Sequence, residues 1–152
     1  MVGVILVGHG GMARGLLEAA ELILGPQENV VALGLDPSED PGTLAAAIRA
    51  AAERLGTEQL VVLADLFGGS PANAAATLWR HGSRMTIIAG LNLPMLLEVL
   101  VSRDASSAAD VARVAVQAGR EGVRDVVAAL RSAMSAREGE NESGNAGQTP
   151  AH

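Results

Sequence analysis

Residues 3–24 read GVILVGHGGMARGLLEAAELIL, an apolar run that leads through His9 and its flanking glycines into a segment with helical spacing. The run at residues 3–8 is rich in β-branched side chains and is apolar at consecutive positions, which indicates a strand buried on both faces. From Leu16 to Leu24 the apolar residues share one helical stripe and the charged residues lie opposite. The stretch therefore predicts a strand followed by a helix, the repeating unit of a parallel α/β sheet.

The same alternation continues along the chain. Three more short apolar runs predict strands at residues 29–35, 59–64 and 84–90, and helical spacing fills the segments between them. A further helix is expected from Pro94 to about Ser102, and residues 107–137 are helix-prone with interruptions at Gly119 and Gly122. The pattern predicts an α/β domain with right-handed crossovers, whose ligand site lies beyond the carboxyl ends of the strands where the strand order reverses.

The amino-acid composition excludes several classes of protein. The chain has 152 residues, a formal net charge of -6, no Cys, one Phe and one Trp. The absence of Cys excludes a disulfide framework and a thiolate metal site, and an acidic chain with two aromatics lacks the basic patch and stacking surface of a nucleic-acid binder. No apolar run reaches about 18 residues, so no membrane insertion is expected. The start, MVGVILVGHGG, does not resemble a signal peptide, and a cytoplasmic location is expected.

The last fifteen residues differ from the rest. Residues 138–152, EGENESGNAGQTPAH, have no aliphatic side chain larger than Ala and carry three of the 17 acidic residues but none of the 11 Arg. Such a composition cannot bury enough apolar surface to fold. We therefore expect one domain over residues 1–137 and a disordered acidic tail over 138–152.

His9 is the first candidate for chemistry. It is flanked by Gly8, Gly10 and Gly11 at the junction of the first strand and helix. Gly10 and Gly11 allow a phosphate to approach the backbone closely, and the helix amino terminus that follows offers free N–H groups. A His here can be a nucleophile, a general base or a metal ligand; equally, the glycines can form only a tight turn with His9 as a solvated tip. The motif is neither a P-loop nor a dinucleotide fingerprint.

Asp65 is the second candidate. The sequence Asp65–Pro71, DLFGGSP, follows the third strand and leads into a helix that Ser70 is expected to cap. If the strands are ordered 2-1-3-4, Asp65 lies beside His9, where its carboxylate can accept from Nδ1–H and leave Nε2 free to attack. Asp65 can also be simply a turn residue.

Two other residues are weaker candidates for the functional site. Asn92 either lines the same rim or only precedes a helix that Pro94 opens, and His81 is interpreted as a helix-end residue that complements the helix dipole. We predict no obligatory metal and no cofactor.

Together the motifs resemble the enzyme IIA component of the mannose family of the bacterial sugar phosphotransferase system. The matching stretches are ILVGHGGMARGLLEAAELILGPQENV, LADLFGGSPANAAA, IIAGLNLPMLLEVL and VAVQAGREGVRD, within about residues 1–125. The resemblance implies a three-layer, flavodoxin-like fold with a mostly parallel sheet in the order 2-1-3-4 and helices on both faces. It also implies a homodimer that exchanges a C-terminal antiparallel strand near residues 122–127.

The resemblance further implies a phosphotransferase role for the chain. His9 would accept a phosphoryl group from the carrier protein HPr and pass it to enzyme IIB, Asp65 would orient His9, and Gly68, Gly69 and Ser70 would form the loop that holds the phosphate. Phe67 stands where some members have Trp. The 152 residues hold no IIB domain, so we expect a separate acceptor protein, in sugar uptake or its regulation.

Three other functions compete. The first is a regulatory phosphoprotein of an incomplete phosphotransferase system, which would use the same site. The second is a small tetrapyrrole metal chelatase, which shares VGHG but needs a second metal-binding His, for which His81 is the candidate. The third is a phosphohistidine phosphatase or mutase, which normally has Arg directly before His-Gly, where this chain has Gly8.

Overall fold

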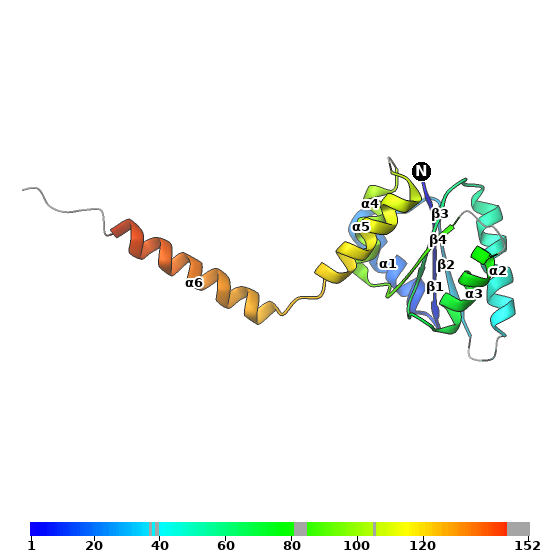
Figure 1. The fold of residues 1–152 in the computed structure, drawn as a ribbon, viewed down its shortest axis with the longest axis horizontal. Helices are drawn as coiled ribbons and strands as arrows, with labels where there is room; N and C mark the ends of the chain where they lie inside the picture. Colours follow the sequence, from blue (N-terminus) through cyan, green and yellow to red (C-terminus); the bar gives the residue numbers. More distant parts are fainter. Residues whose placement is uncertain (37, 39, 81–84, 105, 146–152) are drawn as a thin grey trace, which may run out of the picture. The chain divides into compact units, whose positions relative to one another are not determined.

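Four parallel strands form one sheet in the order β2-β1-β3-β4, as expected for the α/β class. The computed structural model describes residues 1–36, 38, 40–80, 85–104 and 106–145 (Figure 1). The elements in chain order are β1 (Gly3–His9), α1 (Met12–Leu24), β2 (Val30–Leu35), α2 (Pro41–Leu55), β3 (Leu60–Ala64), α3 (Ser70–Arg80), β4 (Met85–Ala89), α4 (Leu93–Ser102), α5 (Ala108–Glu121) and α6 (Val126–Asn145).

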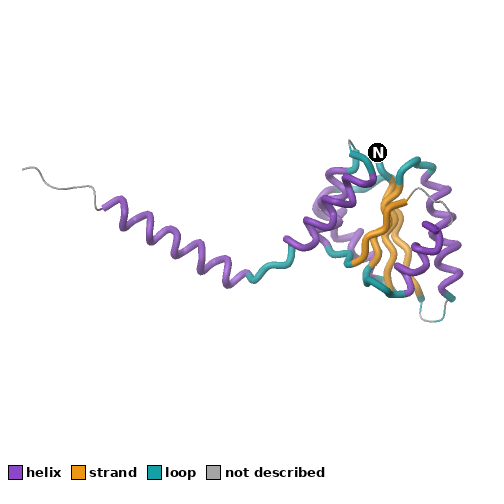
Figure 2. The backbone as a smooth tube through the Cα atoms, in the orientation of Figure 1, coloured by secondary structure: helices purple, strands orange, loops and turns teal. Residues whose placement is uncertain are grey.

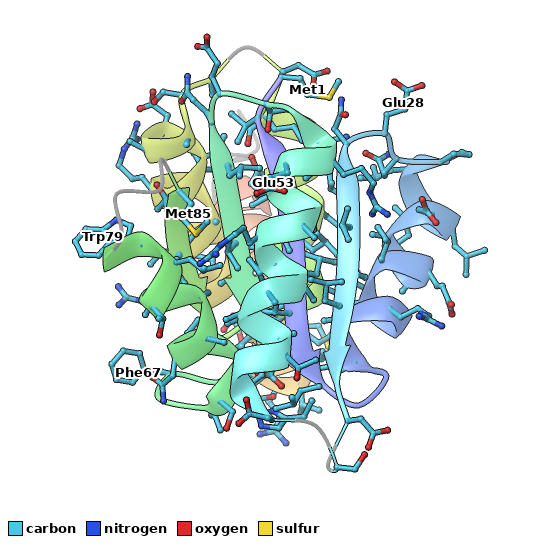
Figure 3. The ribbon with its side chains drawn as sticks, turned by 90° about the vertical axis from the view of Figure 1, so that its right-hand side faces the viewer. Met1, Glu28, Glu53, Phe67, Trp79 and Met85 are labelled. Carbon is cyan, nitrogen blue, oxygen red and sulfur yellow. The ribbon has the colours of Figure 1, made fainter. Side chains whose placement is uncertain are left out.

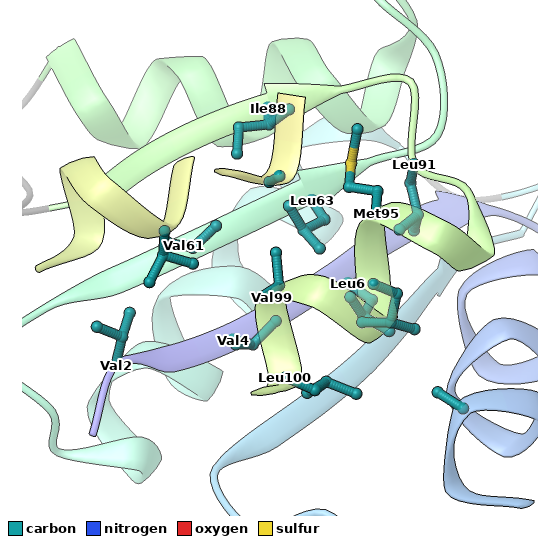
Figure 4. Close-up of a cluster of buried hydrophobic side chains, with 14 of the residues drawn as sticks. Val2, Val4, Leu6, Val61, Leu63, Ile88, Leu91, Met95, Val99 and Leu100 are labelled. Atoms are coloured by element: carbon teal, nitrogen blue, oxygen red, sulfur yellow. The ribbon is translucent and has the colours of Figure 1, made fainter. Parts of the chain in front are cut away.

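Helices cover both faces of the sheet (Figure 2). Alternate side chains of β1 and β3 enter two separate cores: Val4, Leu6, Val61 and Leu63 pack beneath α1, α4 and α5 (Figure 4). Ile5, Val7, Val62 and Ala64 pack beneath α2 and α3. The central strands are thus buried on both sides, which explains why their sequences are apolar at consecutive positions rather than at alternate ones.

Helix boundaries follow local chemistry, with one correction. The Asp40 side chain caps α2, Pro41 opens that helix, and Gly56 closes it in the left-handed conformation. At α3 the predicted cap is displaced by one residue. Ser70 is already helical, and the carbonyl of Gly69 accepts from the N–H of Asn73 at 3.0 Å, so Gly69 holds the cap position.

The helix-prone stretch after residue 107 breaks at Gly122 and not at Gly119. Gly119 lies buried inside α5, where a Cβ would come within 2.7 Å of Met95 Cε of α4. A Cβ on Gly122 would come within 2.4 Å of the Pro94 ring. Both glycines therefore allow α4 and α5 to pack closely, and only Gly122 ends the helix.

The chain divides into two compact units, Met1–Gly122 and Val123–His152. The strand expected near residues 122–127 is not formed in the described single chain, because Gly122 caps α5 and α6 begins at Val126. Residues 138–145 belong to α6, and 146–152 lie outside the described residues, so the expected domain boundary at residue 137 stays a prediction. Within the described part of the chain, no helix is both long enough and apolar enough to cross a membrane.

Arg103 is a buried cation at the end of the sheet opposite His9. Its side chain is 3% exposed, and its guanidinium donates to the carbonyl of Asn29 at 3.4 Å and to Gln27 Oε1 at 3.3 Å. Its own carbonyl accepts from Val2 N–H at 3.0 Å. Arg103 therefore joins the end of α4 to the loop before β2 and to the start of β1.

We expect Arg103→Ala to lower the free energy of unfolding by about 2–4 kcal/mol, because it leaves a cavity and removes the hydrogen bonds to Asn29 and Gln27. Urea denaturation measures this loss. Arg113→Ala is the matched control: its ion pair with Asp110 is exposed, and we expect a much smaller effect. Equal losses in the two variants would contradict the role given to Arg103.

Candidate active site

His9 and Asp65 lie at the carboxyl ends of the two central strands. Val7 of β1 pairs with Ala64 at the end of β3, and the Asp65 N–H donates to the Val7 carbonyl at 3.1 Å. His9 is the last residue of β1, and Asp65 directly follows β3. The edge where the strand order reverses is thus the place where these two side chains meet.

One oxygen of Asp65 holds both the backbone and the ring of His9. Oδ2 accepts from the His9 N–H at 2.8 Å and lies 2.7 Å from Nδ1. Gly8 makes room for this oxygen, since a Cβ there would lie 3.3 Å from it. The two contacts fix the side-chain torsions of His9 relative to its own backbone.

The carboxylate determines which ring nitrogen of His9 is free. Burial by itself raises the pKa of Asp65, but the hydrogen bonds from the His9 N–H and ring and the attraction of the ring's charge outweigh burial and leave that pKa below its ordinary value. An ionised carboxylate only accepts hydrogen bonds, so Nδ1 carries the hydrogen and the neutral ring has its lone pair on Nε2. The His9 side chain is 52% exposed, against 8% for Asp65. The arrangement presents a nucleophilic nitrogen to solvent.

The lowered pKa of Asp65 makes the stability of the protein depend on pH. A carboxyl whose pKa is lower in the folded state stabilises the fold above its unfolded pKa, and this contribution is lost as the pH falls through the folded value. We expect the difference in unfolding free energy between the wild type and Asp65→Asn to be largest near pH ~7 and to shrink by pH ~3.5. Urea denaturation at both pH values measures it. If the difference in unfolding free energy did not change with pH, it would contradict the lowered pKa of Asp65.

The loop after β1 offers backbone donors. Gly10 has φ +54° and its N–H donates to the Leu35 carbonyl at 2.9 Å. Gly11 occupies the cap position of α1 with no side-chain hydrogen bond to the helix, so the N–H groups of the first turn have no intrahelical acceptor. Gly10, Gly11 and Arg14 line a hollow of about 300 Å³. Arg14, which is not among the predicted site residues, thus lies close to this loop.

The second loop is a tight turn against the His9 ring. The Gly69 N–H donates to the Leu66 carbonyl at 3.2 Å, and the third residue of the turn, Gly68, has the φ of +76° that a type II turn requires there. A Cβ on Gly69 would lie 3.3 Å from His9 Cε1, the atom bonded to Nε2. Gly69 therefore has no free N–H, whereas those of Gly68 and Ser70 have no acceptor among the described residues.

Of the remaining candidates, Asn92 lies within the described residues. Asn92 caps α4 by accepting from Met95 N–H at 3.0 Å, and its Nδ2 donates to the Gly119 carbonyl at 3.1 Å; its role is to join α4 to α5. His81 lies outside the described residues. In the described part of the chain, no three His, Asp or Glu side chains gather as a metal site.

The fold and this pair define a parallel α/β protein with an oriented, exposed histidine at the switch point. A family model described as "PTS system fructose IIA component" matches residues 3–116. The mannose-specific EIIAB component of Escherichia coli (strain K12) is 39% identical over 125 residues, 81% of this chain and 39% of that protein. The chain therefore spans less than half of that relative.

Two further proteins match over more of their length. The fructose-specific EIIA component of Bacillus subtilis (strain 168) is 38% identical over 105 residues, 68% of this chain and 72% of that protein. The crystal structure of EIIA from Streptococcus agalactiae superposes with a TM-score of 0.79 and 29% identity, covering 84% of this chain and 99% of that one. The chain belongs to the EIIA components of the mannose family of the phosphotransferase system (PTS).

Proposed function

We propose that this chain is a phosphohistidine relay in which His9 accepts a phosphoryl group from HPr and passes it to a separate enzyme IIB. The observation that carries the proposal is the 2.7 Å contact between His9 Nδ1 and Asp65 Oδ2. It leaves the Nε2 lone pair as the nucleophile, which neutral imidazole supplies at physiological pH. Family membership supplies the reaction class, since PTS EIIA components are phosphotransferase relay proteins.

The bonds formed and broken in the transfer step can be accounted for without a metal. The Nε2 lone pair attacks the phosphorus of the donor's phosphohistidine in line, the donor N–P bond breaks, and its electron pair returns to the donor imidazole. His9 then carries phosphate on Nε2 and hydrogen on Nδ1, and the resulting positive charge on the ring faces Asp65. Transfer to IIB is the same step with His9 as the donor.

Backbone groups and exposed apolar side chains support this role. The free N–H groups near Gly11, Gly68 and Ser70 can stabilise the equatorial oxygens of the transferring phosphoryl group. Leu66 and Phe67 are 60% and 90% exposed in the turn beside His9, and Figure 3 shows the Phe67 ring projecting from the body of the domain. Exposed apolar side chains at a reactive site suit a protein partner rather than a small polar substrate.

We further propose that the protein acts in the cytoplasm as a homodimer that exchanges the segment near residues 122–127, in sugar uptake or its regulation. The exposure of Val123, Val126 and Val127, at 80%, 68% and 56%, supports a partner for this segment. Sedimentation of the purified chain at a few concentrations tests the dimer.

Incubation of the purified chain with phosphoenolpyruvate, enzyme I and HPr tests the relay. The expected product carries one phosphate that is labile in acid and stable in base, and it loses the phosphate on addition of a IIB protein of the mannose family. No phosphate on the chain, with HPr itself phosphorylated, would contradict the proposal.

A further inference from the structure

Asn73 closes the turn beside His9 from the side of α3. Its Nδ2 donates to the carbonyl of Gly68 at 3.1 Å. The N–H of the same peptide group, that of Gly69, donates to the Leu66 carbonyl at 3.2 Å. Both ends of the peptide unit that joins Gly68 to Gly69 are therefore held, one by the turn itself and the other by a side chain.

Asn73 is itself held in place by α3. Its N–H donates to the Gly69 carbonyl at 3.0 Å, and its own carbonyl accepts from Thr77 Oγ1 at 3.0 Å. The side chain thus extends from a residue in the first turn of the helix back over the loop that precedes it. A donor anchored on a helix positions a loop more rigidly than a donor on another loop does.

The held peptide adjoins the His9 ring. The position of a Cβ on Gly69 lies 3.3 Å from His9 Cε1, the ring carbon between Nδ1 and Nε2. A carbonyl oxygen facing a transferring phosphoryl group repels it, whereas N–H groups stabilise it. Since glycines leave the backbone at this turn free to rotate, something must keep the Gly68 carbonyl engaged elsewhere, and the Asn73 amide does so.

We propose that Asn73 is a positioning residue for phosphoryl transfer at His9, which engages the Gly68 carbonyl and so keeps the 68–70 loop in the orientation that accepts an anion. This inference rests on the proposed relay function. It differs from the role of Asp65, since Asn73 bonds the loop beside the ring, whereas Asp65 bonds Nδ1.

Single-turnover phosphorylation by phospho-HPr tests the inference with two variants. Asn73→Ala removes the donor, and we expect the rate constant at saturating phospho-HPr to fall about tenfold, the equivalent of one hydrogen bond. Asn73→Asp keeps the shape but cannot donate and adds negative charge, so we expect a larger fall. The donor concentration for half-maximal rate should stay unchanged in Asn73→Ala, because the effect is on the transition state.

Gln117→Ala is the matched control, since it removes an exposed side-chain amide that donates to Glu121 Oε1 at 3.1 Å on α5, and we expect its rate to equal that of the wild type. Thermal unfolding should show both Asn73 variants folded, and the ¹⁵N shifts of the His9 ring should match the wild type, which separates this effect from loss of the Asp65 contact. A wild-type rate in Asn73→Ala, or a loss as large in Gln117→Ala, would overturn the inference alone. Failure of the wild-type chain to take phosphate on His9 would overturn the relay function together with it.

Discussion

Replacing His9 with glutamine should abolish phosphorylation of this chain. The structure leaves one nucleophilic nitrogen at the site, Nε2 of His9, because Nδ1 is hydrogen-bonded to Asp65 at 2.7 Å. A glutamine amide is not a nucleophile, so the step that forms the new N–P bond has no electron pair to use. We expect acid-labile phosphate from phosphoenolpyruvate, enzyme I and HPr to fall to background, as measured with ³²P-labelled donor.

The two other histidines of the chain provide the controls. His81→Gln and His152→Gln should incorporate phosphate as the wild type does, since neither belongs to the proposed site. Because the His9 side chain is 52% exposed, its replacement should leave the thermal transition nearly in place. Phosphate incorporated into a folded His9→Gln variant at the wild-type rate would contradict the assignment.

Replacing Asp65 with asparagine should give the second-largest loss of transfer. The carboxylate can only accept from Nδ1, whereas a carboxamide can also donate to it and so favour the tautomer with hydrogen on Nε2. That tautomer has no lone pair at the exposed nitrogen. An imidazole held in the wrong tautomer loses activity by a factor on the order of 10⁴, and we expect a loss of up to that order in the single-turnover rate.

The ¹⁵N shifts of the ring report the cause of this loss directly. In the wild type we expect a protonated Nδ1 and an unprotonated Nε2, and in Asp65→Asn a shift toward the reverse. Asp110→Asn, which changes an exposed carboxylate on α5, should alter neither the shifts nor the rate. Wild-type transfer by Asp65→Asn would show that the carboxylate does not orient His9 for the reaction.

The arrangement of the sheet could be predicted from the residues because the signals there were strong. The four apolar runs at consecutive positions match strands that are buried beneath helices on both faces. The contact between His9 and Asp65 was predicted only on the condition that the strand order was 2-1-3-4. The observed order satisfies that condition, and the site geometry follows from it.

Details that depend on tertiary contacts could not be predicted from the sequence. A glycine inside a helical pattern resembles a break, but Gly119 is needed for close packing against Met95. The cap of α3 lies at Gly69 because the preceding tight turn already ends there. Asn73 gave no signal, since one polar residue in the first turn of a helix is ordinary and its role depends on where the turn places the Gly68 carbonyl.

The position of the phosphate on the imidazole tests the central claim most directly. The chain should be phosphorylated by phospho-HPr and examined by ³¹P and ¹⁵N NMR, with labelled histidine, under basic conditions that preserve the N–P bond. The structure predicts phosphate on Nε2 of His9 with hydrogen retained on Nδ1. Phosphate on Nδ1 of His9, or on another residue, would contradict it.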